Sequence, residues 1–150
     1  MREMTCHGNY FDLPGENESC TITTNGILKY NGNLVMGAGI AKAAAERYPE
    51  LPEVLGKLVR RGGNHVYAVQ TAKGPMILSF PTKHHWKDPS DLGLILRSAK
   101  ELVQLADYYQ LTTVYSVRPG CSNGKLDWES QVREPLSRIL DDRFIIVSKE

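Results

Sequence analysis

The chain has few cysteines and no pair of them at metal-ligand spacing. Among its 150 residues there are three, Cys6, Cys20 and Cys121, and none belongs to a Cys-x-x-Cys motif. Three cysteines cannot all pair, so a small scaffold built on disulfides is excluded, and the usual cysteine zinc patterns are missing. This usage is typical of a reducing compartment, and we expect a cytoplasmic protein.

Long apolar runs are also missing. No stretch approaches the ~20 residues that cross a bilayer, and residues 1–5 lack the apolar core of a signal peptide, so we expect no membrane contact. Charge of one sign is missing too, since 18 Lys and Arg face 17 Asp and Glu. The net charge of +1 gives no electrostatic reason to expect duplex nucleic-acid binding, although it leaves room for a local basic patch.

What is present is the composition of an ordinary globular protein. Hydrophobic residues make up 41% of the chain and charged residues 23%. A chain of 150 residues can bury roughly two-thirds of its unfolded surface around one core. Because no repeat or linker divides the sequence, we expect residues 1–150 to form a single, monomeric domain.

Short β-branched and aromatic segments alternate with segments of helical periodicity. Strands are predicted at 21–24, 66–70, 76–80, 113–117 and 144–147, with a further short strand before Gly8. Helices are predicted at 40–47, 53–61 and 91–109, with a last one from about Asp127. This alternation predicts an α/β fold whose largely parallel sheet is covered on both faces.

Several residues indicate where the helices begin and end. The pair Gly62-Gly63 is a typical C-terminal signal. Ser90 is predicted to cap the long helix, and Asp127 the last one, a role we favour over a catalytic one. Pro135 is expected to kink the last helix or to start a new turn.

The most informative stretch is 33–47, in which a glycine loop runs directly into an alanine-rich helix. Glycines let the backbone approach a ligand, and the helix N-terminus adds a positive dipole end, so this arrangement suits phosphate. Gly37-Ala38-Gly39 is neither a dinucleotide fingerprint nor a P-loop, and a plain tight turn is the alternative. Asn25, just upstream, suits sugar hydroxyls or ordinary turn chemistry.

Two further loops follow predicted strands, and the carboxyl ends of parallel strands are where α/β folds bind ligands. A second glycine loop lies within 118–128, so a diphosphate held between two loops is a natural ligand. Lys83 follows the strand at 76–80, where a lysine partly withdrawn from water can act as nucleophile or base; a solvated surface lysine is the alternative. His84 and His85 lack metal-ligand spacing, so no metal is expected, and Trp86 is predicted to pack under the long helix.

Four segments together resemble the macrodomain family, whose members bind ADP-ribose. They are Thr23-Thr24-Asn25-Gly26, Val35-Met36-Gly37-Ala38-Gly39-Ile40-Ala41, Ser79-Phe80-Pro81-Thr82-Lys83-His84-His85-Trp86 and the run from Arg118 to Trp128. The sequence is most similar to the branch that contains the DNA-de-ADP-ribosylating antitoxin DarG and the terminal ADP-ribose glycohydrolase of animals. The resemblance implies a three-layer α/β/α fold with a mostly parallel mixed sheet.

The resemblance also implies a role for each matching residue. Asn9 would contact adenine, Asn25 would lie near the distal ribose, and the two glycine loops would hold the distal ribose and the diphosphate. The implied binding residues are Asn9, Asn25, Met36, Gly37, Ala38, Gly39, Ile40, Pro119, Gly120, Cys121, Ser122, Asn123 and Gly124. Lys83 matches the lysine that attacks, or helps to activate, the anomeric carbon of the distal ribose. The expected partner is ADP-ribose or an ADP-ribosylated macromolecule, DNA or protein, and no cofactor is expected.

The sequence departs from the family pattern in the second loop. Gly124 stands where the animal enzyme has an aspartate, although the antitoxin also has glycine there. Ser122 and Lys125 replace residues that are often glycine, and Val117 stands where proline is common. The resemblance as a whole implies hydrolysis of a terminal ADP-ribosyl bond. Two alternatives stay open, a module that only binds ADP-ribose and a phosphatase acting on ADP-ribose 1″-phosphate.

Overall fold

A six-stranded sheet lies at the centre of the structure, a computed structural model that describes residues 1–149. Its strands are β1 (Arg2–Cys6), β2 (Glu18–Thr24), β3 (Ala68–Gln70), β4 (Met76–Pro81), β5 (Thr113–Val117) and β6 (Phe144–Lys149). They lie in the order β1-β6-β5-β2-β4-β3, and all neighbours are parallel except β3 and β4. The predicted mostly parallel sheet is confirmed, including the strand before Gly8.

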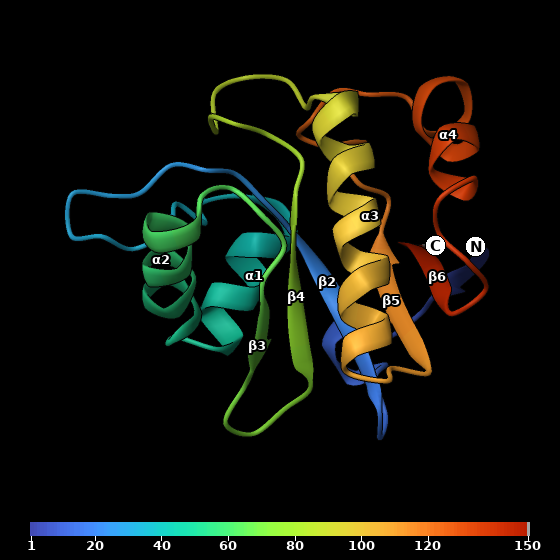
Figure 1. Cartoon of the computed structure of the whole chain (residues 1–150), viewed down its shortest axis with the longest axis horizontal. Coiled ribbons are helices and arrows are strands. Elements are labelled where there is room, and N and C mark those ends of the chain that lie inside the picture. The colour runs from blue at the N-terminus through green and yellow to red at the C-terminus, as the bar shows by residue number, and fades with distance from the viewer. Residues whose placement is uncertain (150) are drawn as a thin grey trace.

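Helices cover both faces of this sheet. They are α1 (Gly39–Arg47), α2 (Leu51–Gly62), α3 (Leu92–Tyr108) and α4 (Arg133–Ser137), with a 3₁₀ turn η1 (Tyr10–Asp12) and a π-helical turn η2 (Trp128–Val132). One face carries η1, α1 and α2, and the other carries α3, η2 and α4 (Figure 1). The expected three-layer α/β/α fold is confirmed.

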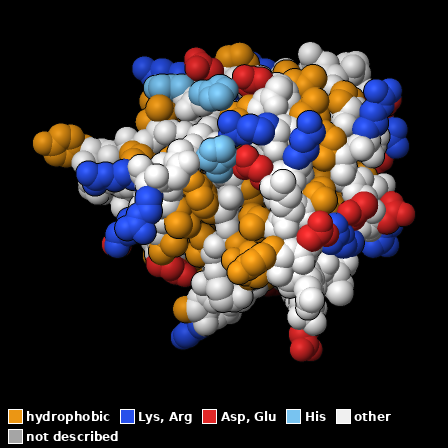
Figure 2. All heavy atoms as spheres, viewed as in Figure 1, with side chains coloured by type: hydrophobic (Ala, Val, Ile, Leu, Met, Phe, Trp, Pro, Cys, Tyr) orange, Lys and Arg blue, Asp and Glu red, His pale blue; other side chains and the backbone are white. Residues whose placement is uncertain are grey.

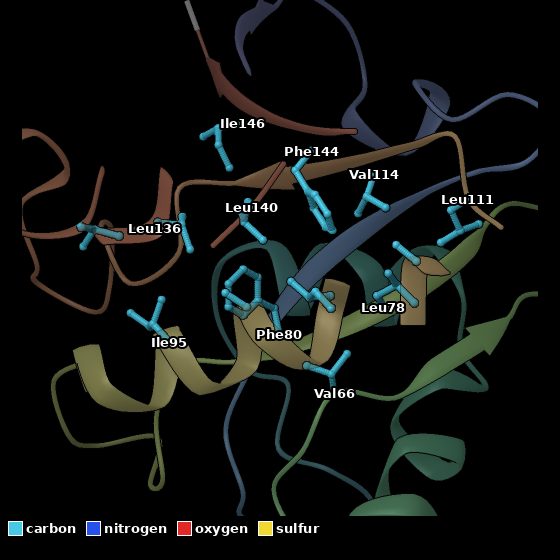
Figure 3. Packing of buried hydrophobic residues seen from close by; sticks show 14 of the residues in the cluster. Val66, Leu78, Phe80, Ile95, Leu111, Val114, Leu136, Leu140, Phe144 and Ile146 are labelled. Carbon is cyan, nitrogen blue, oxygen red and sulfur yellow. The ribbon is translucent and has the colours of Figure 1, made fainter. Parts of the chain in front are cut away.

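Two hydrophobic clusters hold the layers together, because neighbouring residues of a strand point to opposite faces. Ile77 belongs to the cluster under α1 and α2, whereas Leu78 belongs to the one under α3. In that second cluster Phe80 and Phe144 are fully buried, and they pack between the sheet and Ile95 of α3 (Figure 3). The alternation therefore fixes which side chains of each strand are buried and which helix covers them.

The strands β2 and β5 separate towards their carboxyl ends. Their ladder pairs only three residues, Glu18 to Cys20 with Thr113 to Tyr115. Beyond it, the Tyr10 hydroxyl lies between the strands, 2.8 Å from the Thr21 carbonyl and 2.9 Å from that of Tyr115, and the Thr21 N–H donates to it. Burial raises the pKa of the Tyr10 phenol well above its usual range, so the hydroxyl stays neutral.

Three predictions of local structure need correction. The strand predicted at 66–70 begins only at Ala68, because the N–H groups of Val66 and Tyr67 donate to the side chains of Glu101 and Ser79 instead of to a strand. The cap of α3 is Asp91, whose carboxylate accepts from Leu94 N at 3.2 Å, and not Ser90. Trp86 does not pack under α3: its side chain is 48% exposed.

Two predictions on the last helix are confirmed. Asp127 caps it by accepting from the N–H of Ser130 at 2.8 Å. The π-helical turn gives way to α4 at Arg133, two residues before Pro135, which lacks an N–H group. The π-helical turn η2 therefore ends close to Pro135, where the backbone has no N–H donor, and the α-helical turn α4 begins.

Removing the cap of α3 gives a first testable prediction. Asp91→Ala is expected to lower the free energy of unfolding by about 1 kcal/mol at pH 7, because the first turn loses its side-chain acceptor. For a chain of this size that corresponds to roughly 2–4 °C in Tm, measured by scanning calorimetry. Asp88→Ala is the matched control, since in the described residues only the backbone of Asp88 makes a hydrogen bond.

The same cap has a pH dependence with a defined sign. The N–H of Leu94 lowers the pKa of Asp91 below its ordinary value of 3.8, with a further contribution from His84. The capping contribution is therefore complete above about pH 4 and is lost as pH falls through the folded-state pKa. The Tm difference between wild type and Asp91→Ala should shrink below that pH. A difference that stays constant down to pH 2 would contradict the assignment.

Among residues 1–149, no helix is both long and apolar enough to cross a membrane.

Candidate functional site

The three loops singled out in the sequence meet at the carboxyl edge of the sheet. The Lys83 ammonium donates to the Asn123 carbonyl at 3.3 Å, which joins the β4–α3 loop to the second glycine loop. A Cβ atom on Gly39 would lie 3.3 Å from Nδ2 of Asn123, so the two glycine loops touch. The N–H of Gly26 donates to the His84 carbonyl at 3.1 Å. The structure thus brings together the residues that the sequence placed on separate loops.

The first glycine loop leaves the beginning of α1 open. Ala38 takes the extended capping position, and no side chain caps the first turn. Gly39 has a φ of 58°, in the left-handed region that favours glycine. Gly37, Ala38 and Gly39 are exposed, whereas Met36 is buried and Ile40 is half-buried. The N–H groups at this helix start therefore face open space, as an anion site requires.

The second glycine loop is closed by its own backbone. Gly120 accepts from Leu126 N at 2.9 Å, and the N–H of Ser90 donates to the Gly124 carbonyl at 2.9 Å. Gly120 has a φ of 77°, and both glycines are buried with Pro119, whereas Ser122 and Asn123 are exposed. Of these two exposed residues, Asn123 lies next to Gly39 at the start of α1.

Burial raises the pKa of the Cys121 thiol to about 11, and its Sγ lies 3.3 Å from the Pro119 carbonyl. Cys121 is therefore a neutral packing residue of the second glycine loop and lacks the thiolate that a nucleophile needs.

Lys83 is half-buried where β4 ends. Its ammonium points at two carbonyl oxygens, Asn123 at 3.3 Å and Trp86 at 3.5 Å. Within residues 1–149, no carboxylate lies within ion-pairing distance of this ammonium. The amine is therefore aimed at the junction of the loops without a charged partner.

The two predicted asparagines both make local hydrogen bonds. The amide of Asn25 donates to the Val35 carbonyl at 3.0 Å and accepts from the N–H of Ile27 at 2.9 Å. Asn9 is exposed and caps η1 by accepting from Phe11 N at 2.9 Å. Asn25 thereby ties the two ends of segment 25–35 together, whereas the exposed Asn9 keeps its amide group free to donate.

Concavities of about 330 and 260 Å³ lie at the opposite edge of the sheet, near Gly15 and Gly74. The smaller one borders Glu18 and Met76, the first residues of β2 and β4, and both are lined by Gly15, Gly74 and Pro75. The candidate site is therefore formed by loops at the carboxyl edge and does not coincide with these hollows.

Sequence and structure comparisons agree on one family. No profile of a known protein family matches the chain. The DNA ADP-ribosyl glycohydrolases of Mycobacterium tuberculosis and Mycobacterium bovis are 37% identical over 101 residues, which is 63% of this chain and 29% of theirs. The solved macrodomain of Mycobacterium tuberculosis DarG matches with a TM-score of 0.75 and 29% identity, over 98% of this chain and 99% of that one. The chain has the macrodomain fold, and its sequence is similar to that of DarG macrodomains.

The fold of this macrodomain also matches Thermosipho africanus DarTG, solved in complex with ADP-ribose, with a TM-score of 0.75 and 19% identity. That match covers 99% of the macrodomain and 42% of the other chain. The macrodomain spans less than a third of the length of the mycobacterial relatives.

Two residues next to the site were not predicted as site residues, although the sequence predicts Ser90 as a helix cap. Asn64 donates to the Lys83 carbonyl at 3.0 Å, and its Oδ1 atom is buried without a partner. Ser90 lies under the second glycine loop, with a buried hydroxyl that also has no partner. Their neighbours come from distant parts of the chain, so no local pattern marks them.

The histidines of the macrodomain lie at the rim of the site. The Nε2 atom of His84 lies within hydrogen-bonding distance of the Asp91 carboxylate, at 3.2 Å, and the ring of His85 stacks on Trp86. Figure 2 shows histidine side chains gathered over the β4–α3 loop. No group of three or more metal-ligating side chains is present among residues 1–149.

Proposed function

We propose that this macrodomain binds ADP-ribose and hydrolyses the bond between ADP-ribose and DNA. The observation that carries the proposal is the meeting of Lys83 with two glycine loops at the carboxyl edge of the sheet. The open start of α1 can hold one phosphate and the second loop can close over the other. The relatives named as DNA ADP-ribosyl glycohydrolases support the reaction, and the DarTG complex supports the ligand.

In this proposal the ligand lies across the split between β2 and β5. Adenine lies towards Asn9, the diphosphate lies between the glycine loops, and the distal ribose lies over Gly39 with its anomeric carbon near Lys83. The remaining residues of the two loops, from Met36 to Ile40 and from Pro119 to Gly124, enclose the ligand. DNA then leaves the site beyond Lys83, on the side of β4 and β3.

The chemistry follows from the bond that breaks. Cleavage builds positive charge on the anomeric carbon, and the electron pair of the bond leaves with the DNA base. Lys83 can give a proton to the departing base and bond to that carbon through its neutral amine, and water later breaks this bond to free the amine and ADP-ribose. Alternatively, Lys83 can orient a water that attacks directly. In both routes the loops hold the ribose in place, which can contribute several kcal/mol to lowering the barrier.

Titration calorimetry with ADP-ribose, with AMP as control, tests the binding half of the proposal. We expect a Kd tighter than about 100 μM for ADP-ribose and much weaker binding of AMP, which lacks the distal ribose and one phosphate. Absence of heat and of thermal stabilisation with ADP-ribose would contradict the proposed ligand.

A non-catalytic ADP-ribose-binding module is the second candidate. One observation favours it: the Lys83 amine has no carboxylate partner in the described residues. Incubation with an ADP-ribosylated DNA oligonucleotide separates the candidates, because only the hydrolase releases free ADP-ribose. An ADP-ribosylated protein, run in parallel, tests whether the reaction is confined to DNA.

A further inference from the structure

We propose that an aromatic and basic rim beside Lys83 binds the single-stranded DNA that carries the ADP-ribosyl group. The rim consists of Lys29 and Tyr30, at the tip of the hairpin 26–34, and of Trp86 and Lys87 in the β4–α3 loop. We call these four residues the aromatic rim. The inference rests on the proposed function, because the rim is placed by reference to the bond that Lys83 faces.

Tyr30 is an unpartnered ring on an ordered stretch of backbone. Its exposure is 110% of the reference value, and no hydrogen bond, ion pair or ring contact involves its side chain in residues 1–149. The backbone beneath it is ordered by the Leu28–Leu34 bridge and by the Lys29 N–H, which donates to the Asn33 carbonyl at 2.7 Å. An exposed ring on a fixed turn adds little to folding, but it gives a stacking ligand a preorganised surface.

The hairpin is also fixed against α2. A Cβ atom on Gly56 would lie 2.1 Å from the Gly32 carbonyl oxygen, so the two backbones are in direct contact. The Leu34 N–H donates to the Pro52 carbonyl at 2.9 Å. Tyr30 is thereby held at a set position relative to the site and does not depend on a flexible loop.

Trp86 supplies a second exposed ring on a residue whose backbone contacts Lys83. The Trp86 carbonyl accepts from the Lys83 ammonium at 3.5 Å, while its indole is 48% exposed. His85 stacks on the indole at 5.4 Å between ring centroids, and the Lys87 ammonium lies 5.2 Å from the indole centroid. A base that stacks on Trp86 can displace this exposed ammonium, which then becomes available to a phosphate.

The two parts of the rim lie on the same side of the site. The hairpin begins at Gly26, whose N–H donates to the His84 carbonyl in the β4–α3 loop. Tyr30 is four residues further on, so it lies within about 14 Å of that contact. The sheet ends on this side with β4 and β3. Single-stranded DNA that leaves the site at Lys83 therefore runs outward past both rings.

Positive charge accompanies the rings. Lys29 and Lys87 are exposed, and Arg60 and Arg61 of α2 are exposed next to the hairpin. Figure 2 shows Lys and Arg side chains gathered over α2 and the hairpin. Rings alternating with cations are the arrangement that binds single strands, because bases stack on the rings while phosphates pair with the cations. A protein whose net charge is only +1 thus carries a local basic surface at this point.

The test measures binding of an unmodified, fluorescein-labelled DNA 12-mer to the full chain by anisotropy. Tyr30→Ala and Trp86→Ala are each expected to weaken binding at least about 5-fold, and Tyr30→Phe to retain wild-type binding. Tyr108→Ala is the matched control, because Tyr108 is 77% exposed at the far end of α3. Lys29→Ala should lower the slope of log affinity against log salt by about 0.7.

Titrating the same variants with free ADP-ribose keeps this inference apart from the proposed function. If the rim is correct, Tyr30→Ala and Trp86→Ala bind ADP-ribose like wild type and lose affinity only for DNA. Wild-type protein that does not bind the DNA, or rim variants that bind it as tightly as Tyr108→Ala does, would overturn the rim. Rim variants that lose DNA affinity while no protein binds ADP-ribose would support the rim and contradict the proposed ligand.

Discussion

Lys83→Ala is expected to lower the rate of ADP-ribose release from ADP-ribosylated DNA by about 10²–10⁴-fold. The reason is positional: among residues 1–149, Lys83 is the one lysine whose ammonium donates to the second glycine loop, at 3.3 Å from the Asn123 carbonyl. Binding of free ADP-ribose should weaken less than about 10-fold, because the backbone of both loops is unchanged. Single-turnover kinetics measure the release rate, and calorimetry on the same preparations measures the Kd for ADP-ribose.

Two further measurements separate the routes open to Lys83. Lys83→Arg keeps the positive charge but removes the nucleophilic amine, so it stays inactive if the lysine forms a bond and recovers part of the rate if it acts by charge alone. A covalent route also leaves an adduct on Lys83 that borohydride reduction and peptide mass spectrometry detect. Turnover by Lys83→Ala at the wild-type rate would show that the amine has no part in the reaction.

The second large effect is expected at Gly124. A Cβ atom there would lie 2.0 Å from the Ser90 hydroxyl and 2.5 Å from the Gly120 carbonyl oxygen, so the second glycine loop must shift to accept any side chain. Gly124→Ala should cost about 1–3 kcal/mol of folding free energy, or roughly 2–10 °C in Tm. ADP-ribose affinity should fall at least about 10-fold, because the shifted loop no longer closes over the diphosphate.

Two variants serve as references for Gly124→Ala. Gly37→Ala should leave Tm unchanged, since a Cβ atom at that position meets nothing within 4 Å. Ser90→Gly combined with Gly124→Ala should restore part of the lost stability, because it removes the closer of the two obstructions. A Gly124→Ala variant that matched wild type in both Tm and ADP-ribose affinity would contradict the close packing of the second glycine loop on Ser90. The same contacts leave no room for an aspartate side chain at position 124, the position where the animal enzyme has one.

Much of the fold could be predicted because its determinants are local. Alternation of Ile77 and Leu78 between the two faces, and the Gly62-Gly63 end of α2, are visible in short stretches of sequence. Ser90 and Asp91 are equally good caps by residue type, and the choice between them depends on Ser90 being buried under the second glycine loop. Local sequence does not contain that information.

The site was predictable only as far as its loops. Each loop can be recognised by its glycines or by its place after a predicted strand. The loops are expected to meet because the carboxyl ends of parallel strands lie at the same edge of the sheet. The exposure of Trp86 was missed, because an indole is usually buried and nothing nearby indicates otherwise. Asn64 was missed because its contact with the Lys83 carbonyl joins residues 19 positions apart.

The divergence of β2 and β5 divides the sheet into two units. One unit, β1-β6-β5, carries the second glycine loop, and the other, β2-β4-β3, carries the first glycine loop and Lys83. Past Cys20 the strands β2 and β5 are linked through the Tyr10 phenol and the hydrogen bond from the Thr21 hydroxyl to Ser116. A ligand that binds both glycine loops would therefore connect the two units at the carboxyl edge, where the sheet itself joins them least.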